Sequence, residues 1–557
     1  MTDRPRDHLR IALAQLNPVM GDIAGNLARA RAARATAAAG NADLILFPEL
    51  FLCGYPPEDL VMKPALQADC RAAVEDFAPD TADGGPAVLI GTPWPENGRP
   101  YNAVAYLDGG KVEAITRKVD LPNYGVFDEK RVFAAGSMPG PLNIRGVRIG
   151  VPICEDIWTP DIVECLSETG AEFLLVPNGS PFDALKRDVR LHHAVSRVVE
   201  SGLPLVYLNQ IGGQDELAFD GASFVLNADR NVALQMPGFV EQIAFTDWHR
   251  TAEGWRCEPG ELAKIEQGHA AVYGAMMLAL RDYVNKNRFP GVVIGLSGGI
   301  DSALTAAVAA DALGPERVRC LMMPSRYTSQ ESLDDAAEIA RLLGIHYDIV
   351  PIEAAVNAFG TMLAPLFAGR TPDTTEENIQ ARIRGLSLMA VSNKFGHMVV
   401  ATGNKSELSV GYATLYGDMN GGYNVLKDVY KMDVFALSRW RNANVPNGAL
   451  GPKGRVMPDN VITRPPTAEL RADQKDEDSL PPYPVLDGIL ERLVEREMSF
   501  DEIVADGYDP ATVKRIENML YVAEYKRRQA PPGVKLSARN FGRDRRYPIT
   551  NAYRNAK

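Results

Sequence analysis

The strongest constraint on the fold is an alternation of short, β-rich apolar runs with helix-length segments, which occurs in both halves of the chain. In the first half, the apolar runs lie at residues 10–17, 43–49, 87–94, 147–154, 172–178 and 204–210. Such an alternation indicates a layered α/β architecture. Residues 221–247 are expected to form paired strands with polar turns, which close this first unit.

The 557 residues exceed the size at which one hydrophobic core stops growing, so two large domains are expected. Polarity and helical periodicity near the middle of the chain predict a first domain at 8–250, a linker at 251–267 and a second domain at 268–557. Strands in the second domain are predicted at 291–296, 318–324, 346–350 and 397–403, separated by helices at 330–343 and 376–395. This order predicts a parallel, doubly wound sheet. The Pro-rich stretch 451–483 has few apolar anchors and is expected to be a mobile loop.

Composition excludes several classes of protein. The net charge of −12 argues against nucleic-acid binding, although a basic excess at 526–557 leaves open both a phosphate contact and a solvated tail. No apolar run reaches the roughly 18 to 20 residues that span a bilayer, and residues 1–10 lack a signal-peptide segment. The six cysteines show no disulfide-scaffold spacing. We therefore expect a cytoplasmic protein with reduced thiols and no membrane partner.

A glycine-rich hexapeptide follows the predicted strand 291–296 and opens a helix. It reads Ser297, Gly298, Gly299, Ile300, Asp301, Ser302. Glycines allow close backbone approach, and free amides at a helix N-terminus bind phosphate oxygens. The segment lacks the Gly-Lys-Ser/Thr ending of a Walker A loop. It resembles the SGGxDS pyrophosphate loop of ATP-pyrophosphatase enzymes, which cleave ATP to AMP and pyrophosphate; a ligand-free strand-to-helix turn is the structural alternative.

Further motifs in this half narrow the resemblance. They are EENIQAR at 376–382, ATGNKSE at 401–407, Gly-Tyr at 411–412, Tyr-Gly-Asp at 416–418 and KDVYK at 427–431. Together they resemble the synthetase domain of NAD⁺ synthetases, over roughly residues 268–557. The resemblance implies that ATP is contacted by Ser297, Gly298, Gly299, Asp301, Ser302, Thr402 and Lys431. It implies that the deamidated dinucleotide is contacted by Asn378, Glu407, Tyr412, Asp418 and Lys526.

The residue types fit that chemistry. A carboxylate that attacks the α-phosphate of ATP needs its negative charge offset, and Asp301 and Glu407 offer the hard oxygens that Mg²⁺ prefers. Lys431 and the loop amides would neutralise the departing pyrophosphate. The other dinucleotide contacts each have an alternative: Asn378 as a helix cap, Tyr412 as a core residue and Lys526 as a solvated charge.

The first half contains three motifs that carry, in order, a Glu, a Lys and a Cys. They are FPEL at 47–50, RKVDLP at 117–122 and PICEDIW at 152–158. In this order they resemble the nitrilase superfamily, over about residues 8–250, which implies an αββα sandwich. The resemblance implies a nucleophilic Cys154, a general base Glu49 and a Lys118 that stabilises the oxyanion. A buried Glu–Lys pair beside a structural Cys is the alternative.

The same resemblance implies further roles in the first half. Glu129 matches a second family carboxylate that positions the triad, with a structural ion pair as the alternative. The glutamine pocket is implied to include Tyr55, Tyr124, Phe127, Glu155, Ser180 and Lys186. The neighbouring Arg187 is an open alternative to Lys186. The other five cysteines are expected to be packing residues, and the seven His show no spacing typical of a zinc site.

The combination of the two halves resembles glutamine-dependent NAD⁺ synthetases. It implies that glutamine hydrolysis supplies ammonia, which amidates adenylated nicotinic acid adenine dinucleotide to give NAD⁺, AMP and pyrophosphate. The family also implies a homo-oligomer, at least a dimer. Two alternatives are another glutamine-fed adenylating amidotransferase with a different acceptor, and a nucleotide-sensing scaffold of inactive modules. Loss of Cys154, Glu49, Lys118 or Asp301 would favour the scaffold, but all four are present.

Overall fold

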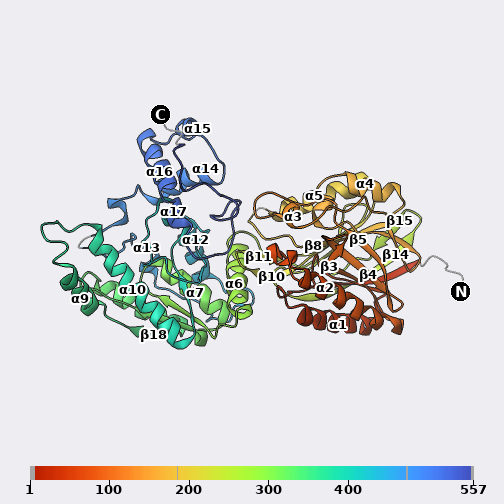
Figure 1. Cartoon of the computed structure of the whole chain (residues 1–557), viewed down its shortest axis with the longest axis horizontal. Helices are drawn as coiled ribbons and strands as arrows, with labels where there is room; N and C mark the ends of the chain where they lie inside the picture. Colours follow the sequence, from red (N-terminus) through yellow and green to blue (C-terminus); the bar gives the residue numbers. More distant parts are fainter. Residues whose placement is uncertain (1–6, 185, 472–473, 554–557) are drawn as a thin grey trace. The chain divides into compact units, whose positions relative to one another are not determined.

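The computed structural model describes residues 7–184, 186–471 and 474–553, which form two α/β units (Figure 1). The first unit runs to Gln214 and resumes at Ala218–Glu266; the second comprises Asp215–Leu217 and the chain from Gln267 onward. Among the described residues, no helix is long and apolar enough to cross a bilayer.

Two sheets form the first unit. One has the strand order β15-β14-β1-β2-β3-β4-β5. Its strands are β1 (His8–Gln15), β2 (Leu44–Leu46), β3 (Ala87–Glu96), β4 (Arg99–Asp108), β5 (Lys111–Arg117), β14 (Gln242–Thr251) and β15 (Gly254–Cys257). The other has the order β13-β12-β9-β8-β7-β6. Its strands are β6 (Leu142–Ile144), β7 (Val147–Gly150), β8 (Phe173–Asn178), β9 (Leu205–Asn209), β12 (Phe224–Leu226) and β13 (Val232–Gln235). A separate hairpin pairs β10 (Ile211–Gln214) with β11 (Leu217–Asp220).

The central strands of each sheet are buried on both faces, which explains why they appear as continuous apolar runs. In β1, Leu9, Ile11 and Leu13 belong to the core between the sheets, whereas Ala12 and Ala14 belong to the core under the helices. The helices of this unit are α1 (Ile23–Ala39), α2 (Pro64–Phe77), α3 (Glu129–Val132), α4 (Asp161–Glu168) and α5 (Lys186–Ser201). Helices α1 and α2 cover the first sheet, and α4 and α5 cover the second. The expected αββα sandwich is confirmed.

Part of the predicted linker 251–267 belongs to the first sheet instead. Strand β15 pairs antiparallel with β14, and Trp255 and Cys257 are buried in the core between the sheets. The polar residues that alternate with these two side chains face outward and made the segment appear unstructured by composition. The remaining residues, 258–267, connect the two units.

The second unit contains the predicted parallel sheet, in the order β18-β17-β16-β19-β20. Its strands are β16 (Val292–Gly295), β17 (Val318–Met322), β18 (His346–Ile349), β19 (Met398–Ala401) and β20 (Tyr423–Asn424). Every neighbouring pair is parallel. The chain moves outward from β16 in one direction and then returns to β19 on the other side. The topological switch point therefore lies between the carboxyl ends of β16 and β19, where ligands of such sheets bind.

Helices cover both faces of this sheet, as expected for a doubly wound fold. They include α6 (Gly268–Lys286), α7 (Ile300–Leu313), α8 (Gln330–Leu343), α9 (Glu353–Leu363), α10 (Thr374–Phe395), α11 (Lys405–Val410) and α12 (Lys431–Ala443). The core beneath α9 and α10 includes Val293, Leu321, Ile383 and Val399. The chain continues into α13 (Asp459–Thr463), α14 (Tyr483–Val494), α15 (Phe500–Ala505), α16 (Pro510–Val522) and α17 (Glu524–Arg527). Of these, α14, α15 and α16 share a hydrophobic cluster with Val410 and Phe541.

The stretch 451–483 is better anchored than its composition indicated. Val456, Met457, Val461 and Leu480 are buried, and α13 lies within the stretch. A few apolar residues at suitable positions are sufficient to pack these parts. The average composition of the whole stretch does not reveal them.

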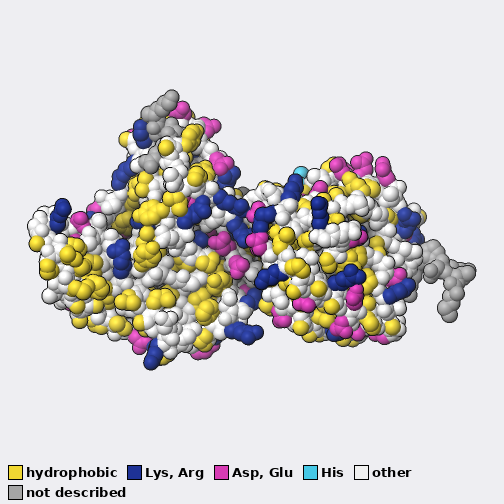
Figure 2. All heavy atoms as spheres, viewed as in Figure 1, with side chains coloured by type: hydrophobic (Ala, Val, Ile, Leu, Met, Phe, Trp, Pro, Cys, Tyr) yellow, Lys and Arg dark blue, Asp and Glu magenta, His cyan; other side chains and the backbone are white. Residues whose placement is uncertain are grey.

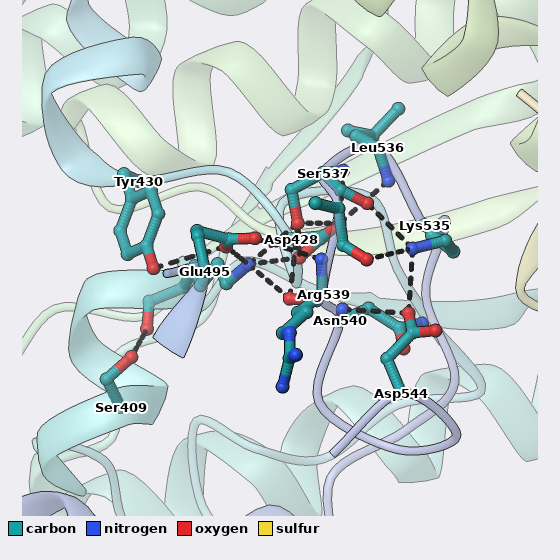
Figure 3. A network of polar contacts seen from close by, with 12 residues as sticks. Ser409, Asp428, Tyr430, Glu495, Lys535, Leu536, Ser537, Arg539, Asn540 and Asp544 are labelled. Carbon is teal, nitrogen blue, oxygen red and sulfur yellow. Dashed lines mark hydrogen bonds and ion pairs between the residues drawn. The ribbon is translucent and has the colours of Figure 1, made fainter. Parts of the chain in front are cut away.

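Within the second unit, a buried polar network joins the segment after α17 to α11 and to the loop before α12 (Figure 3). Lys405 Nζ donates to Asp428 Oδ1 at 2.7 Å, Ser537 Oγ at 2.8 Å and the Arg539 carbonyl at 2.7 Å, and it pairs with Glu495. The ammonium is fully buried, so these partners replace the water that it loses. The network therefore fixes the start of α11 to segments more than 100 residues further along the chain.

Candidate active sites

Three side chains at strand ends form the centre of the first unit. Glu49 follows β2, Lys118 follows β5 and Cys154 follows β7. The Lys118 ammonium lies 2.7 Å from Glu49 Oε1, and both side chains are fully buried. Cys154 is 6% exposed, and the charges of Glu49 and Lys118 both act on its thiol. The structure thus brings together three residues that lie more than 30 residues apart in sequence.

Neutral donors and a second carboxylate hold this centre in place. Glu49 accepts hydrogen bonds from Asn102 Nδ2 at 2.7 Å and from the Gly179 amide at 2.8 Å. On the other side of the ammonium, Glu129 Oε1 lies 3.0 Å from Lys118 Nζ and accepts from the Tyr55 hydroxyl at 2.8 Å. Because every described contact is short and buried, the lysine is fixed between two carboxylates.

Burial dominates the electrostatics of these groups. It raises the pKa of the Cys154 thiol, as does the charge of Glu49, whereas Lys118 opposes the rise. Burial alone would lower the pKa of Lys118, but Glu129 and Glu49 outweigh it and raise the pKa instead. Burial raises the pKa of Glu129 to about 6 despite the neighbouring ammonium. A protonated thiol beside a carboxylate base and a fixed cation is an arrangement suited to nucleophilic attack on a neutral carbonyl compound.

Several residues of the expected glutamine pocket cluster at one edge of this centre. The Tyr124 hydroxyl donates to Glu155 Oε1 at 2.9 Å, and the Tyr124 and Phe127 rings meet edge to face. The Lys186 ammonium lies 4.9 Å from the centre of the Phe127 ring and 5.9 Å from that of Trp158. These contacts combine a cation, a carboxylate and aromatic faces.

The other two residues expected in that pocket lie elsewhere around the centre. Tyr55 is buried against Glu129, as described above. Ser180 Oγ accepts from Arg190 Nε at 3.0 Å, and Arg190 pairs with Asp220. Ser180 is therefore part of a buried ion-pair network, next in sequence to the Gly179 amide that binds Glu49.

In the second unit, the glycine-rich loop lies at the carboxyl end of β16. Gly298 has a φ of +83°, and a Cβ at this position would lie 2.4 Å from the Ser332 carbonyl oxygen, so only glycine fits. Ser302 Oγ accepts from the Ser297 amide at 3.2 Å and donates to the Gly299 carbonyl at 3.0 Å. These bonds shape the loop before α7, whose first amides remain available for an anion.

Asp301 and Glu407 converge on one ammonium, that of Lys431. Lys431 Nζ pairs with Asp301 Oδ2 and lies 3.3 Å from Glu407 Oε1. Asn404 links the two carboxylates, since its side chain donates to Asp301 Oδ1 at 2.8 Å and also caps α11 at Glu407. Burial raises the pKa of Glu407 to about 8, with Lys431 opposing the rise and Asp301 adding to it.

This pair of carboxylates fits Mg²⁺. When both acids are ionised they outnumber the single lysine, and a divalent cation would offset this excess charge and favour the ionised form of Glu407. Mg²⁺ commonly takes one or two protein carboxylates and completes its shell with water and nucleotide phosphates. The described residues contain no cluster of three or more metal-ligating side chains.

Two cavities adjoin the loop at the switch point. One, of about 210 Å³, is lined by the loop and by Thr402, Glu407, Tyr412, Asp418 and Lys431. The other, of about 240 Å³, is lined by Leu296, Met322, Arg384 and Leu388 and shares Ser297, Thr402 and Asp418 with the first. Together they extend from the predicted phosphate loop to an apolar recess beside β16 and β17.

Two of the expected dinucleotide contacts lie outside the linings of these cavities. Asn378 Oδ1 accepts from Thr414 Oγ at 2.8 Å; it lies inside α10, whose cap is Asp373, so the helix-cap alternative is wrong. Lys526 Nζ donates to the carbonyls of Gly411 and Ala413, each at 2.7 Å, so it is not a freely solvated charge. Both residues support the loop that carries Tyr412 and Asp418.

Comparison with known proteins identifies the family of each half of the chain. Residues 10–256 match the family described as carbon-nitrogen hydrolase, and residues 272–530 match NAD synthase. The chain is 52% identical to the glutamine-dependent NAD(+) synthetase of Rhodobacter capsulatus over the full length of both, and 45% identical to that of Acinetobacter baylyi over 98% and 99%. The solved structure of the Acinetobacter baumannii enzyme in complex with ADP is 42% identical, covers 99% of this chain and 100% of its own, and has a TM-score of 0.78. The chain belongs to the glutamine-dependent NAD⁺ synthetases.

Two polar residues beside these synthetase centres were not predicted from sequence. Asn102 lies in β4 and bridges Glu49 and Glu129, with a longer contact of 3.4 Å to Glu129. Asp476 is 4% exposed, lines the 210 Å³ cavity and accepts from the hydroxyls of Tyr483 at 2.8 Å and Tyr412 at 3.3 Å. Asp476 belongs to the stretch predicted as a loop. No sequence motif marks either residue; only the tertiary contacts reveal them.

Proposed function

We propose that this chain makes NAD⁺ in two linked reactions: the first unit releases ammonia from glutamine, and the second transfers it to adenylated nicotinic acid adenine dinucleotide. The observation that carries the proposal is that each unit holds a lysine between two carboxylates beside a group suited to its reaction. Lys118 lies between Glu49 and Glu129 beside Cys154, and Lys431 lies between Asp301 and Glu407 beside the phosphate loop. Membership of the family supports both halves.

In the first reaction, the Cys154 sulfur attacks the side-chain amide carbon of glutamine as Glu49 accepts the thiol proton. The ammonium of Lys118 stabilises the negative oxygen of the tetrahedral intermediate. Glu49 returns the proton to the amide nitrogen, the C–N bond breaks, and ammonia leaves. Water activated by Glu49 then hydrolyses the thioester and releases glutamate. We assign the contacts with glutamine to Tyr55, Tyr124, Phe127, Glu155, Ser180 and Lys186.

In the second reaction, a carboxylate oxygen of the dinucleotide attacks the α-phosphorus of ATP, and the bond to pyrophosphate breaks. Lys431 and the amides of Ser297–Ser302 hold the pyrophosphate oxygens. Mg²⁺ held by Asp301 and Glu407 would supply further neutralisation of the phosphate charge. Ammonia then attacks the activated carbonyl carbon and loses one proton to water, and AMP leaves with the carboxylate oxygen. We assign Thr402 to ATP, and Asn378, Glu407, Tyr412, Asp418 and Lys526 to the dinucleotide.

We also propose that the protein is a homo-oligomer, at least a dimer, that contacts itself through α9 and α10. No side chain of α9 is fully buried, and exposed apolar residues extend along this surface (Figure 2). They are Met362, Leu366, Phe367, Leu386, Met389 and Phe395. Such a patch is characteristic of protein interfaces. Sedimentation of the native chain and of Leu386→Glu tests this: the native chain should be dimeric or larger, and the variant should dissociate.

We place the reaction in the cytoplasm because it consumes ATP and because the six cysteines form no disulfide. One assay tests the whole proposal. The protein is incubated with ATP, Mg²⁺, glutamine and the deamidated dinucleotide, and NAD⁺, AMP and glutamate are measured. Formation of all three in equal amounts supports the proposal. Ammonia release without any dependence of ATP cleavage on the dinucleotide would instead indicate an amidotransferase with another acceptor.

A further inference from the structure

Asp156 is a buried carboxylate beside the amide-cleaving centre that the proposed reaction does not use. It lies two residues after Cys154 and is 1% exposed. No Lys or Arg side chain forms an ion pair or hydrogen bond with it in the described part of the chain; backbone amides are its partners. Burying an ionisable group in this way is unfavourable, so its contacts indicate what it does.

The two oxygens of Asp156 join two separate segments. Oδ2 accepts from the Ile153 amide at 2.9 Å, directly before the nucleophile. Oδ1 accepts from the Val119 amide at 3.0 Å and the Asp120 amide at 2.8 Å, directly after Lys118. One carboxylate therefore fixes the backbone that carries the sulfur and the backbone that carries the ammonium.

The backbone at Cys154 needs such support. Its φ is +49°, a left-handed conformation that is unfavourable for a residue with a Cβ. The residue opens a short 3₁₀ turn, Cys154–Ile157, in which the Asp156 side chain binds the amide before the turn and the Asp156 amide donates to the Ile153 carbonyl at 3.1 Å. This pair of bonds closes the turn around the nucleophile.

Burial and these hydrogen bonds have opposite effects on the pKa of Asp156. Burial raises the pKa of its carboxyl to about 7, whereas the amides of Ile153, Asp120 and Val119 and the charge of Lys118 oppose the rise. The amide of an asparagine could still accept at one oxygen, but its nitrogen would face the Ile153 donor. Asparagine therefore preserves the bonds on the lysine side and loses the bond on the nucleophile side.

We propose that Asp156 is a positioning residue for amide cleavage, which holds the Cys154 sulfur in register with the Lys118 ammonium. This inference rests on the proposed function of Cys154 and Lys118. It predicts that removal of the carboxylate impairs the chemical step more than substrate binding, because a displacement of about 1 Å lowers a rate by about 100-fold.

The test compares Asp156→Ala and Asp156→Asn with Asp120→Asn as the matched control. Asp120 lies on the same segment, and its side chain accepts only from Thr159 among the described residues. Glutamate release gives kcat and KM for glutamine, and NAD⁺ formation from ammonium chloride shows whether the rest of the chain is folded. We expect kcat to fall about 100-fold in Asp156→Ala, with a partial recovery to about 10-fold in Asp156→Asn. KM, the ammonium-driven rate and the Asp120→Asn variant should stay within about twofold of the native values.

Two results would overturn the inference: a kcat within twofold of native in Asp156→Ala, or an equal loss of glutamine-driven and ammonium-driven synthesis, which indicates general unfolding. Cys154→Ala is measured alongside. If it lacks glutaminase activity while Asp156→Ala is normal, the positioning role alone fails. If Cys154→Ala still hydrolyses glutamine, the proposed function of the first site fails as well.

Discussion

Each unit contains a buried lysine between two carboxylates, yet the two arrangements differ in what surrounds them. Lys118 and Glu49 are fully enclosed; Asn102 shares Glu49 Oε1 with the lysine, and the Gly179 amide binds Oε2. The carboxylates beside Lys431 are 17 to 18% exposed and border a cavity of about 210 Å³. The same motif is closed in one unit and open in the other.

The difference matches the charge of the ligands that we propose. A neutral amide brings no charge, so its site benefits from groups that are fixed in advance and shielded from water, where one cation stabilises an oxyanion strongly. ATP, Mg²⁺ and pyrophosphate bring several charges, so the partners of Lys431 must be able to exchange the ammonium for a metal ion or a phosphate. Accessible carboxylates permit that exchange.

The largest expected effect separates the two sites completely. Cys154→Ala should lower glutamine-driven NAD⁺ formation by at least about 1,000-fold, because the covalent step has no other nucleophile. Synthesis from high ammonium should continue at the native rate. Cys165→Ala, a change at a cysteine in α4, is the control and should be active with both nitrogen sources. Loss of both activities in Cys154→Ala would contradict independent sites.

The converse variants act on the open site. Asp301→Ala and Glu407→Ala should each lower AMP formation at least about 100-fold with either nitrogen source, because phosphoryl chemistry requires the metal charge. Chelation of Mg²⁺ should have the same effect on the native chain. Glutamate release should persist in all three cases, which is measured in parallel. Near-normal AMP formation in a folded Glu407→Ala variant would refute its role as a metal ligand.

The network at Lys405 should distinguish the two units by stability. Lys405→Met leaves the buried carboxylates of Asp428 and Glu495 without their ammonium, which typically lowers the free energy of unfolding by about 3–5 kcal/mol. After graded heating, ammonium-driven synthesis should be lost several degrees earlier than in the native chain, whereas glutaminase activity should survive equally. Lys394→Met, at an exposed lysine of α10, should change neither temperature. Equal losses of both activities would show that the units unfold together.

The smallest expected effect tests whether the sites communicate. An ammonia source fused to an ammonia consumer wastes glutamine unless ligands at the second site favour the competent state of the first. Coupling free energies are typically about 1–3 kcal/mol, or roughly 5- to 150-fold. Glutamate release should therefore rise several-fold when ATP and the deamidated dinucleotide are added together, and the rise should shrink in Asp301→Ala. An identical rate under all conditions would show that the units are only tethered.

The sequence predicted the layered architecture well because the strands carry a clear physical signal. Strands buried on both faces are largely apolar, and β8 and β17 are examples. Ser297 and Thr402 were both assigned to ATP through the resemblance of their motifs, and they follow the neighbouring parallel strands β16 and β19. The motifs around Glu49, Lys118 and Cys154 gave the first site in the same way.

Other contacts could not be predicted from the sequence. Asn102 lies within a strand whose other inward residues are apolar, and its role depends on the pairing of β4 with β5. The hydrogen bond between Tyr412 and Asp476 joins residues 64 positions apart. Asp476 lies in a stretch whose composition favoured a loop. Alternation and composition describe a residue's neighbours along the chain. They contain no information on which distant side chain is a residue's hydrogen-bond partner.

The network in Figure 3 also sets the moment at which the second site can be finished during protein synthesis. Lys405 and Asp428 leave the ribosome long before Ser537 and Arg539, which supply two of the lysine's partners. The first unit can fold as soon as it emerges. A message that ends early, before codon 537, would therefore yield a chain that still breaks down glutamine but cannot complete the machinery that uses the ammonia.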